Sequence, residues 1–184
     1  MAFARKSAKK TPQNEPALYD FAVKALARHM RTEAELRRLL TARAEPGASG
    51  EATVRAVIAQ LKHNHYLDDK SFAETYARLR QENEKLGARR VRNDLRQKGV
   101  RANVIEEAVG ARYSETNEEA LAREHLERKR LKKPENEKEA ARVVRRLVAA
   151  GFSTGTIYKI LRHWDVSEES LAGLENLDTE PREE

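Results

Sequence analysis

The feature that most constrains the fold of this chain is an internal repeat of one hydrophobic pattern. Two copies share a leucine, a glycine with an apolar residue after it, an isoleucine and a last apolar residue, at Leu95, Gly99, Val100, Ile105, Val109 and, 52 positions later, at Leu147, Gly151, Phe152, Ile157, Leu161. Self-similarity at a fixed period is the mark of stacked supersecondary units. The sequence therefore predicts tandem copies of one small unit, in which neighbouring copies contact each other.

The spacing of apolar residues predicts that each unit is helical. The stretch after residue 50 has apolar residues at i, i+3, i+4 and i+7, namely Val54, Val57, Ile58 and Leu61, which lie on one helix face. Helix-favouring residues dominate the composition, and alternating β-branched runs are absent. Three short helices per unit can bury such faces together. We therefore expect an all-α protein, an elongated array of three tandem three-helix repeats that resemble helix-turn-helix units.

Breaks in composition set the expected boundaries of the repeats. The segment EPGASG at residues 45–50 interrupts the first unit and adds residues to its loop. The expected organisation is a flexible basic arm at 1–16, repeats at 17–66, 67–114 and 115–166, and a short helix with an acidic disordered tail at 167–184.

Polar residues at helix starts support these boundaries. Thr32 with Glu35 fits a capping box, and Asp68 or Asp69 can cap the first helix of the second repeat.

In the third repeat we expect Thr116 with Glu119 to cap a helix that reaches about Lys133. Pro134 suits the first turn of the next helix. Trp164 is expected to be the main aromatic anchor of the last helix.

Charge is unevenly distributed along the chain. The net charge is +6, and residues 165–184 carry eight acidic residues and one arginine, a charge of −7, so residues 1–164 carry +13. A basic body indicates a polyanionic partner or a partner with an acidic surface. The alternative is a solvated surface with no partner.

The strongest basic feature is a stripe on the second helix of the middle repeat. Arg89, Arg92 and Arg96 stand at i, i+3 and i+7, on one face. Crowding three guanidinium groups is unfavourable unless an external anion, or glutamates elsewhere in the chain, lie opposite. The candidate partner-facing residues are Arg89, Arg90, Arg92, Arg96, Lys98, Arg101, Arg128, Lys129, Arg130, Lys132, Lys133, Arg142, Arg145 and Arg146.

No pattern of catalytic or metal-binding residues is found. The chain has no cysteine, and it lacks HExxH, a phosphate-binding glycine loop and a nucleophile motif. We therefore expect no enzyme activity, no catalytic residue, no cofactor and no metal site. No apolar run approaches the length of a membrane span, so we expect a cytoplasmic protein.

One ordered set of residues resembles the central signature of a known family, the RecX proteins. The set consists of YLDD at 66–69, then Phe72, Ala73, Tyr76, Arg78, Arg80, Gly87, Arg90, Leu95 and Lys98, Gly99, Val100. The resemblance covers about residues 18–164. The chain departs from the family pattern in the EPGASG insertion, the basic arm and the acidic tail. Arg101 also stands where relatives often have a capping acid.

The resemblance implies a function and a partner. RecX proteins are bacterial regulators that bind along the groove of the RecA filament on single-stranded DNA. They mostly inhibit its recombinase, ATPase and coprotease activities, and so act on DNA repair and the SOS response. The resemblance thus implies a RecA filament as partner, with the candidate cations facing RecA or the DNA, and we expect a monomer.

Two other classes of function stay open from the residues alone. A DNA-binding helix-turn-helix protein would need base-reading side chains, for which Asn93 and Gln97 are the candidates in the second repeat. A purely structural adaptor would bind a protein without DNA.

Overall fold

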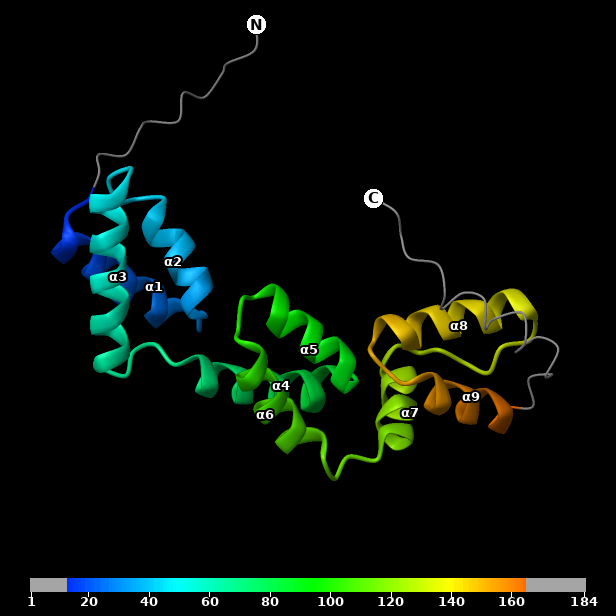
Figure 1. Ribbon diagram of the computed structural model, residues 1–184. Helices are drawn as coiled ribbons and strands as arrows, with labels where there is room; N and C mark the ends of the chain where they lie inside the picture. The colour runs from blue at the N-terminus through cyan, green and yellow to red at the C-terminus, as the bar shows by residue number, and fades with distance from the viewer. Residues whose placement is uncertain (1–12, 165–184) are drawn as a thin grey trace, which may run out of the picture. The chain divides into compact units, whose positions relative to one another are not determined.

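The computed structural model describes residues 13–164, which form nine α-helices (Figure 1). The helices are α1 (Glu15–Arg28), α2 (Glu33–Thr41), α3 (Ala48–His63), α4 (Asp69–Glu84), α5 (Ala88–Gln97), α6 (Ala102–Tyr113), α7 (Glu118–Arg128), α8 (Glu137–Ala149) and α9 (Thr154–His163). Residues 13–164 contain no strand, so the expected all-α class is confirmed. Most of the predicted arm and the whole predicted tail lie outside the described residues.

The chain divides into two compact units. Unit 1 takes the residues up to Phe72 together with the short segment Lys98–Arg101, and unit 2 takes Ala73–Gln97 and the residues from Ala102 onward. The finer division into three repeats stays a prediction.

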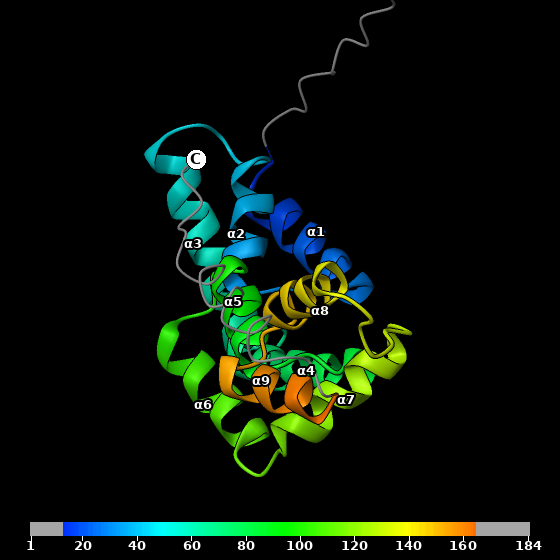
Figure 2. The ribbon, with the colours of Figure 1, turned by 90° about the vertical axis from the view of Figure 1, so that its right-hand side faces the viewer.

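Helices α1, α2 and α3 form the core of unit 1 (Figure 2). Their fully buried residues include Leu18, Leu36, Leu40, Val57 and Leu61. The apolar face predicted for residues 54–61 is therefore the face that α3 buries, and none of the three helices could bury its apolar stripe alone.

The start of α1 corrects the predicted extent of the arm. The Asn14 side chain accepts a hydrogen bond from the Ala17 amide at 3.3 Å, and Pro16 lies in the first turn, where its missing N–H costs nothing. The helix therefore begins at Glu15, inside the stretch 1–16 that we expected to be flexible.

Two helix caps that the sequence predicted can be compared with the structure of unit 1. The Thr32 hydroxyl accepts from the Glu35 amide at 3.1 Å, and the Glu35 carboxylate accepts from the Thr32 amide at 3.2 Å, which confirms the capping box. Asp68, rather than Asp69, serves the start of α4, because it accepts from the Lys70 amide at 2.8 Å.

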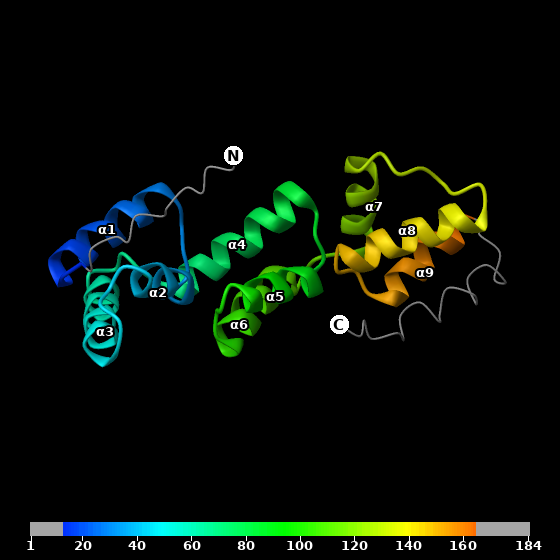
Figure 3. The same cartoon turned by 90° about the horizontal axis from the view of Figure 1, so that it is seen from above.

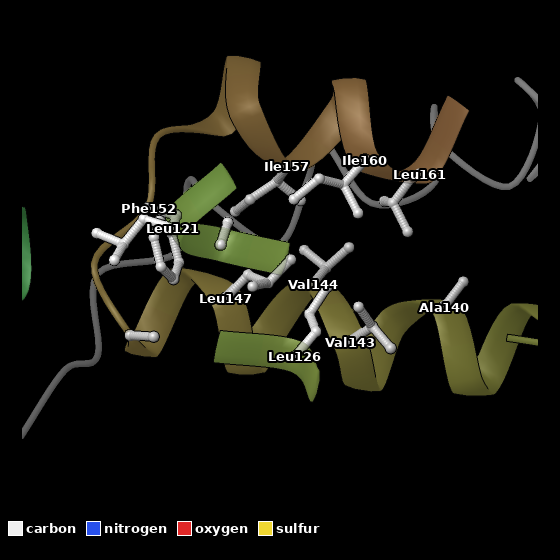
Figure 4. Packing of buried hydrophobic residues seen from close by; sticks show 12 residues of the cluster. Leu121, Leu126, Ala140, Val143, Val144, Leu147, Phe152, Ile157, Ile160 and Leu161 are labelled. Atoms are coloured by element: carbon white, nitrogen blue, oxygen red, sulfur yellow. The ribbon is translucent and has the colours of Figure 1, made fainter. Parts of the chain in front are cut away.

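Helices α7, α8 and α9 build the main core of unit 2, with α8 and α9 side by side (Figures 1 and 3). Figure 4 shows Val144 and Leu147 of α8 facing Ile157 of α9. Phe152, in the turn between these helices, is only 1% exposed. Trp164 is only partly buried at the end of α9, so Phe152 rather than Trp164 is the central aromatic residue.

Helix α7 differs from its prediction at both ends. Asn117, rather than Thr116, caps it by accepting from the Ala120 amide at 3.0 Å. The helix ends at Arg128 instead of near Lys133, because Arg130 adopts a left-handed conformation with φ of 54°. A long side chain rarely adopts this backbone geometry, so no residue type in this stretch signals the stop.

The next helix also starts later than predicted. Pro134 precedes α8, and Asn136 caps it by accepting from the Glu139 amide at 3.0 Å. Residues 129–136 therefore form a loop, which carries several of the candidate cations.

A close backbone contact, the second junction, joins the start of α5 to the turn that follows α8 at residues 150–153. The Gly87 amide donates to the Ala150 carbonyl at 2.9 Å. Gly151 has φ of +88°, and a Cβ placed on it would lie 2.2 Å from the Arg90 amide nitrogen. Only glycine satisfies both the left-handed backbone and this approach.

A matching contact, the first junction, lies in unit 1 between the start of α2 and residues 98–101. The Thr32 hydroxyl donates to the Lys98 carbonyl at 2.7 Å. Gly99 has φ of +80°, and a Cβ on it would lie 2.4 Å from the Ala34 side chain. The predicted register pairs Gly99 with Gly151, so the repeated glycine is explained by a repeated contact.

Each junction also uses a carboxylate from the start of a helix. In the first, Asp69 accepts from the Glu33 amide at 2.8 Å. In the second, Glu118 accepts from the Ser153 amide at 2.9 Å and from the Thr156 hydroxyl at 2.6 Å. Burial alone would raise the pKa of Glu118, but these hydrogen bonds outweigh burial and lower the pKa below its usual value.

The two aromatic residues of the last core should differ in their effect on stability. Phe152→Ala should lower the free energy of unfolding by about 3–5 kcal/mol, because it empties a closed site. Trp164→Ala should cost less, since its side chain already contacts water. Denaturant titrations of the two variants give the comparison, and a larger loss for Trp164→Ala would contradict the assignment of the core.

The second junction predicts a strong effect of one methyl group. Gly151→Ala should cost at least about 2 kcal/mol of unfolding free energy, because the backbone is left-handed and the new Cβ meets backbone atoms. Gly110→Ala is the control, since that exposed glycine in α6 has open space around it. It should raise stability by about 0.5–1 kcal/mol. Equal effects of the two changes would contradict the close contact.

Candidate functional site

The site is a groove in unit 2, which we call the basic groove. Two adjoining cavities of about 510 and 290 Å³ share Arg90, Asp94 and Ala149 in their walls. The groove is lined by Arg80, Glu84, Leu86, Arg89, Arg90, Arg92, Asn93, Asp94, Arg96, Gln97, His125, Lys129, Arg146, Val148, Ala149, Ala150 and Gly151. It exists because the second junction brings the end of α8 against the start of α5.

The lining is strongly positive. Seven of the lining side chains are arginine or lysine and two, Glu84 and Asp94, are acidic. A concave wall of one sign of charge attracts ligands of the opposite sign and concentrates the field between its sides.

Part of this charge is neutralised inside unit 2. Arg90 pairs with Asp94 at 2.9 Å, and Arg92 pairs with Glu106 of α6 at 3.0 Å. A glutamate elsewhere in the chain therefore lies opposite Arg92, and contact of Arg92 with an external anion stays a prediction. Such half-exposed pairs contribute little to stability.

Four lining cations, Arg89, Arg96, Lys129 and Arg146, form no ion pair with any residue between 13 and 164. Arg89 lies in the field of Glu118. Arg96 donates to the neutral Asn93 side chain at 2.8 Å. Lys129, at the end of α7, and Arg146, on α8, are exposed, and no acid of the described residues lies within ion-pair distance of either. Arg96 of α5, Lys129 just after α7 and Arg146 of α8 are the strongest candidates for contact with an external anion.

Arg80 is a lining residue that the charge pattern did not single out. Its guanidinium lies 4.7 Å from the centre of the Tyr76 ring and forms an ion pair with Glu84. The i, i+4 spacing of Tyr76, Arg80 and Glu84 on one helix was the available signal. The Tyr76 hydroxyl donates to Asp94 at 3.2 Å, and burial, with Asp94 nearby, raises the pKa of Tyr76.

His125 forms the floor of one side of the groove. It is 4% exposed, its Nδ1 lies 3.2 Å from the Glu84 carbonyl oxygen, and its ring edge meets Phe152 with ring centres 5.7 Å apart. Burial lowers the pKa of His125, and Lys129 nearby acts in the same direction. The neutral ring therefore donates from Nδ1 to the carbonyl.

The candidate cations predicted from the sequence fall into two groups. The basic groove brings together Arg89, Arg90, Arg92, Arg96, Lys129 and Arg146. Outside its lining are Lys98 and Arg101, which belong to unit 1, and Arg128, Arg130, Lys132, Lys133, Arg142 and Arg145.

Aromatic side chains that could stack on nucleic-acid bases have internal contacts. The Tyr113 hydroxyl donates to the Leu86 carbonyl at 2.8 Å, and burial raises its pKa to about 12. Tyr158 and Trp164 pack against the core of unit 2. These internal contacts favour a structural role for the three residues over stacking on bases.

Two further observations concern the described residues alone. No group of three or more histidine, aspartate or glutamate side chains between residues 13 and 164 could hold a metal ion. Every helix in that range is too short or too polar to cross a bilayer.

Comparisons of the sequence with known proteins all point to the same family. The family model described as the second three-helix domain of RecX matches residues 68–109. The regulatory protein RecX of Cronobacter sakazakii is 35% identical over 156 residues, covering 80% of this chain and 92% of that protein. A regulatory protein RecX of Thermus thermophilus is 32% identical over 154 residues, covering 83% and 94%. These relatives are named as regulators, not as enzymes.

Solved structures show the same fold. A crystal structure of a regulatory protein RecX has a TM-score of 0.66 at 22% identity, covering 81% of this chain and 71% of that one. The crystal structure of RecX from Lactobacillus salivarius has a TM-score of 0.62 at 22% identity, covering 82% and 96%.

The buried histidine predicts a pH dependence of stability. In the unfolded chain His125 has its ordinary pKa near 6.5, and in the fold its pKa is lower. Below pH 6.5 the unfolded state therefore binds more protons, and the free energy of unfolding should fall until the folded pKa is passed. His125→Gln should remove this slope in denaturant titrations. A ring titration by NMR that places the pKa at or above 6.5 would contradict the burial argument.

Proposed function

Because this chain belongs to the RecX family of regulatory proteins, we propose that it binds the RecA nucleoprotein filament along its groove. Binding modulates, and mostly inhibits, the recombinase, ATPase and coprotease activities of RecA. The proposal takes its partner from the family and its contact surface from the basic groove.

The observation that carries the proposal is the set of unpaired groove cations. Arg96 of α5, Lys129 just after α7 and Arg146 of α8 line one concavity without acidic partners in the described chain. Like charges held together in this way are unfavourable in the free protein. An acidic partner surface relieves their repulsion on binding, which favours the complex and speeds encounter.

The chemistry of the lining favours a protein surface over a DNA backbone. Glu84 and Asp94 lie among the cations, and these carboxylates repel phosphates but accept hydrogen bonds from a protein. Val148, 39% exposed, adds an apolar contact within the groove. Core residues of protein interfaces commonly combine arginine with apolar side chains. The groove is thus proposed to contact acidic RecA surface.

One observation keeps direct DNA binding as a second candidate. Asn93 and Gln97, the possible base-reading residues, are exposed in the groove lining. Asn93 already accepts a hydrogen bond from Arg96, so reading a base would require that contact to change. A protein-only adaptor is the third class, and it needs no DNA at all.

Neutralising three of the unpaired cations should weaken filament binding. The variant Arg96→Gln, Lys129→Gln, Arg146→Gln keeps the buried stripe of each helix, and glutamine is close to arginine and lysine in helix propensity. Affinity for the RecA filament should fall about tenfold, since each exposed ionic contact is worth up to about 1 kcal/mol. Inhibition of RecA-driven ATP hydrolysis should weaken equally, and binding should depend less steeply on salt.

A matched variant controls for net charge. Lys138→Gln, Arg142→Gln, Arg145→Gln removes the same charge from exposed positions of α8 that do not line the groove. It should bind and inhibit almost as the parent does. If this control loses inhibition while the groove variant keeps it, the contact surface is wrongly assigned.

Titration against three ligands separates the functions. The proposal expects the parent to bind the assembled filament more tightly than bare single-stranded DNA or RecA alone. Equal binding to bare DNA would favour the direct DNA-binding class, and equal binding to RecA alone would favour the adaptor. Binding to none of the three would refute the proposed function.

A further inference from the structure

We infer that the first junction forms a second binding pocket, in unit 1, which takes a carboxylate-bearing segment of a protein partner through Arg38 and Arg101. The charge pattern of the sequence singled out Arg101 but not Arg38, and neither residue lines the basic groove. The inference rests on the proposed function only for the identity of the partner.

The pocket is a concavity of about 320 Å³ at the start of α2. Its polar and turn residues are Glu33, Arg37, Arg38, Asp69, Gly99 and Arg101. The volume is within the range of small-ligand sites and suits one or two side chains. The close approach of Gly99 to Ala34 fixes its wall.

The acidic groups of the pocket are already engaged. Arg37 pairs with one oxygen of Glu33 at 2.7 Å, and Lys62 pairs with the other at 2.9 Å. Asp69 accepts from the Glu33 amide. The first junction therefore holds its own carboxylates in internal contacts.

Two of the pocket cations have no ion-pair partner among the described residues. Arg38 and Arg101 are both exposed, and neither forms an ion pair with a residue between 13 and 164. Arg101 feels the field of Asp69 from beyond ion-pair distance. Two arginines that share one concavity can hold a single carboxylate through charge-assisted hydrogen bonds.

Arginine is an unfavourable residue type at position 101, because it does not stabilise the start of the helix that follows. It directly precedes α6, where a side chain with an acceptor oxygen would satisfy a backbone N–H. Arginine has no acceptor, and its charge is repelled by the positive end of the helix dipole. A residue type that is unfavourable for local structure is expected where function requires it.

The second junction shows what the position looks like without this role. The equivalent residue is Ser153, which precedes α9 and accepts from the Thr156 amide at 3.3 Å. Its hydroxyl also donates to Glu118 at 2.5 Å. The same joint thus has a capping serine in unit 2 and an exposed arginine in unit 1, so the fold itself does not require the arginine.

The lining favours a protein carboxylate over a phosphate. Glu33 and Asp69 add negative charge beside Arg38 and Arg101, and a phosphate with more charge than a carboxylate is repelled more strongly. Both Glu33 oxygens are engaged, but Asp69, whose Oδ1 accepts from the Glu33 amide, can accept a further hydrogen bond from a peptide N–H. A nucleic-acid strand has far fewer donors to offer it.

The first experiment measures binding of the full chain to the RecA filament. Arg38→Gln, Arg101→Gln should weaken binding by at least about tenfold, as expected for two charge-assisted contacts. Lys24→Gln, Arg55→Gln removes the same charge from exposed positions of α1 and α3 and should change affinity less than about twofold. If the parent binds and the pocket variant binds equally well, the inference is overturned.

A probe that does not depend on RecA keeps the two proposals apart. A short polyglutamate peptide should shift the backbone amide signals of Gly99 and Arg101 in NMR spectra of the parent, and these shifts should vanish in the Arg38→Gln, Arg101→Gln variant. Shifts by polyglutamate together with failure to bind the filament would refute only the proposed function. Shifts by oligothymidine rather than polyglutamate would overturn the carboxylate assignment.

A single substitution tests the pocket in a variant that is expected to be more stable than the parent. Arg101→Ser restores the capping residue of the second junction and should raise the unfolding temperature by about 2–4 °C. Its filament affinity should nevertheless fall. A stabilised variant with the affinity of the parent would show that Arg101 has no binding role and would overturn the inference.

Discussion

The structure of unit 2 depends on one close backbone contact. The Gly87 amide meets the Ala150 carbonyl at 2.9 Å, and neither Gly87 nor Gly151 has room for a Cβ. Because the backbones approach so closely, the start of α5 and the end of α8 share one surface. Arg96 and Arg146, which are 50 residues apart in the chain, therefore line the same groove. The contact that stabilises the core also creates the concavity.

Sequence reasoning was successful where the signal is local or periodic. The capping box at Thr32 depends on residues three apart, and the buried face of α3 repeats with the helix period. The glycines of the two junctions were visible as an internal repeat. The end of α7 was missed because Arg130, not glycine, adopts the left-handed turn, and side-chain type predicts such turns only for glycine and asparagine.

The groove was predictable only in part, because its walls meet through tertiary contacts. The stripe of α5 arginines followed from helical spacing. The pairing of Arg92 with Glu106 required α6 to pack beside α5, and no local rule gives that geometry. The joining of Lys129 and Arg146 to the stripe required the second junction. Charge counts located the basic segments but could not say which cations were already neutralised.

Comparison of the two junctions shows which residues are the same in both and which differ. Gly99 and Gly151 both have a left-handed backbone and a neighbour too close for a Cβ, Ala34 in the first junction and Arg90 in the second, so no other residue fits. The residues around them differ, with Arg101 in one junction and Ser153 in the other. Exposed positions beside a fixed joint can change charge without disturbing the core. A repeat of the fold therefore does not impose a repeat of the surface, and each junction can present its own chemistry to a partner.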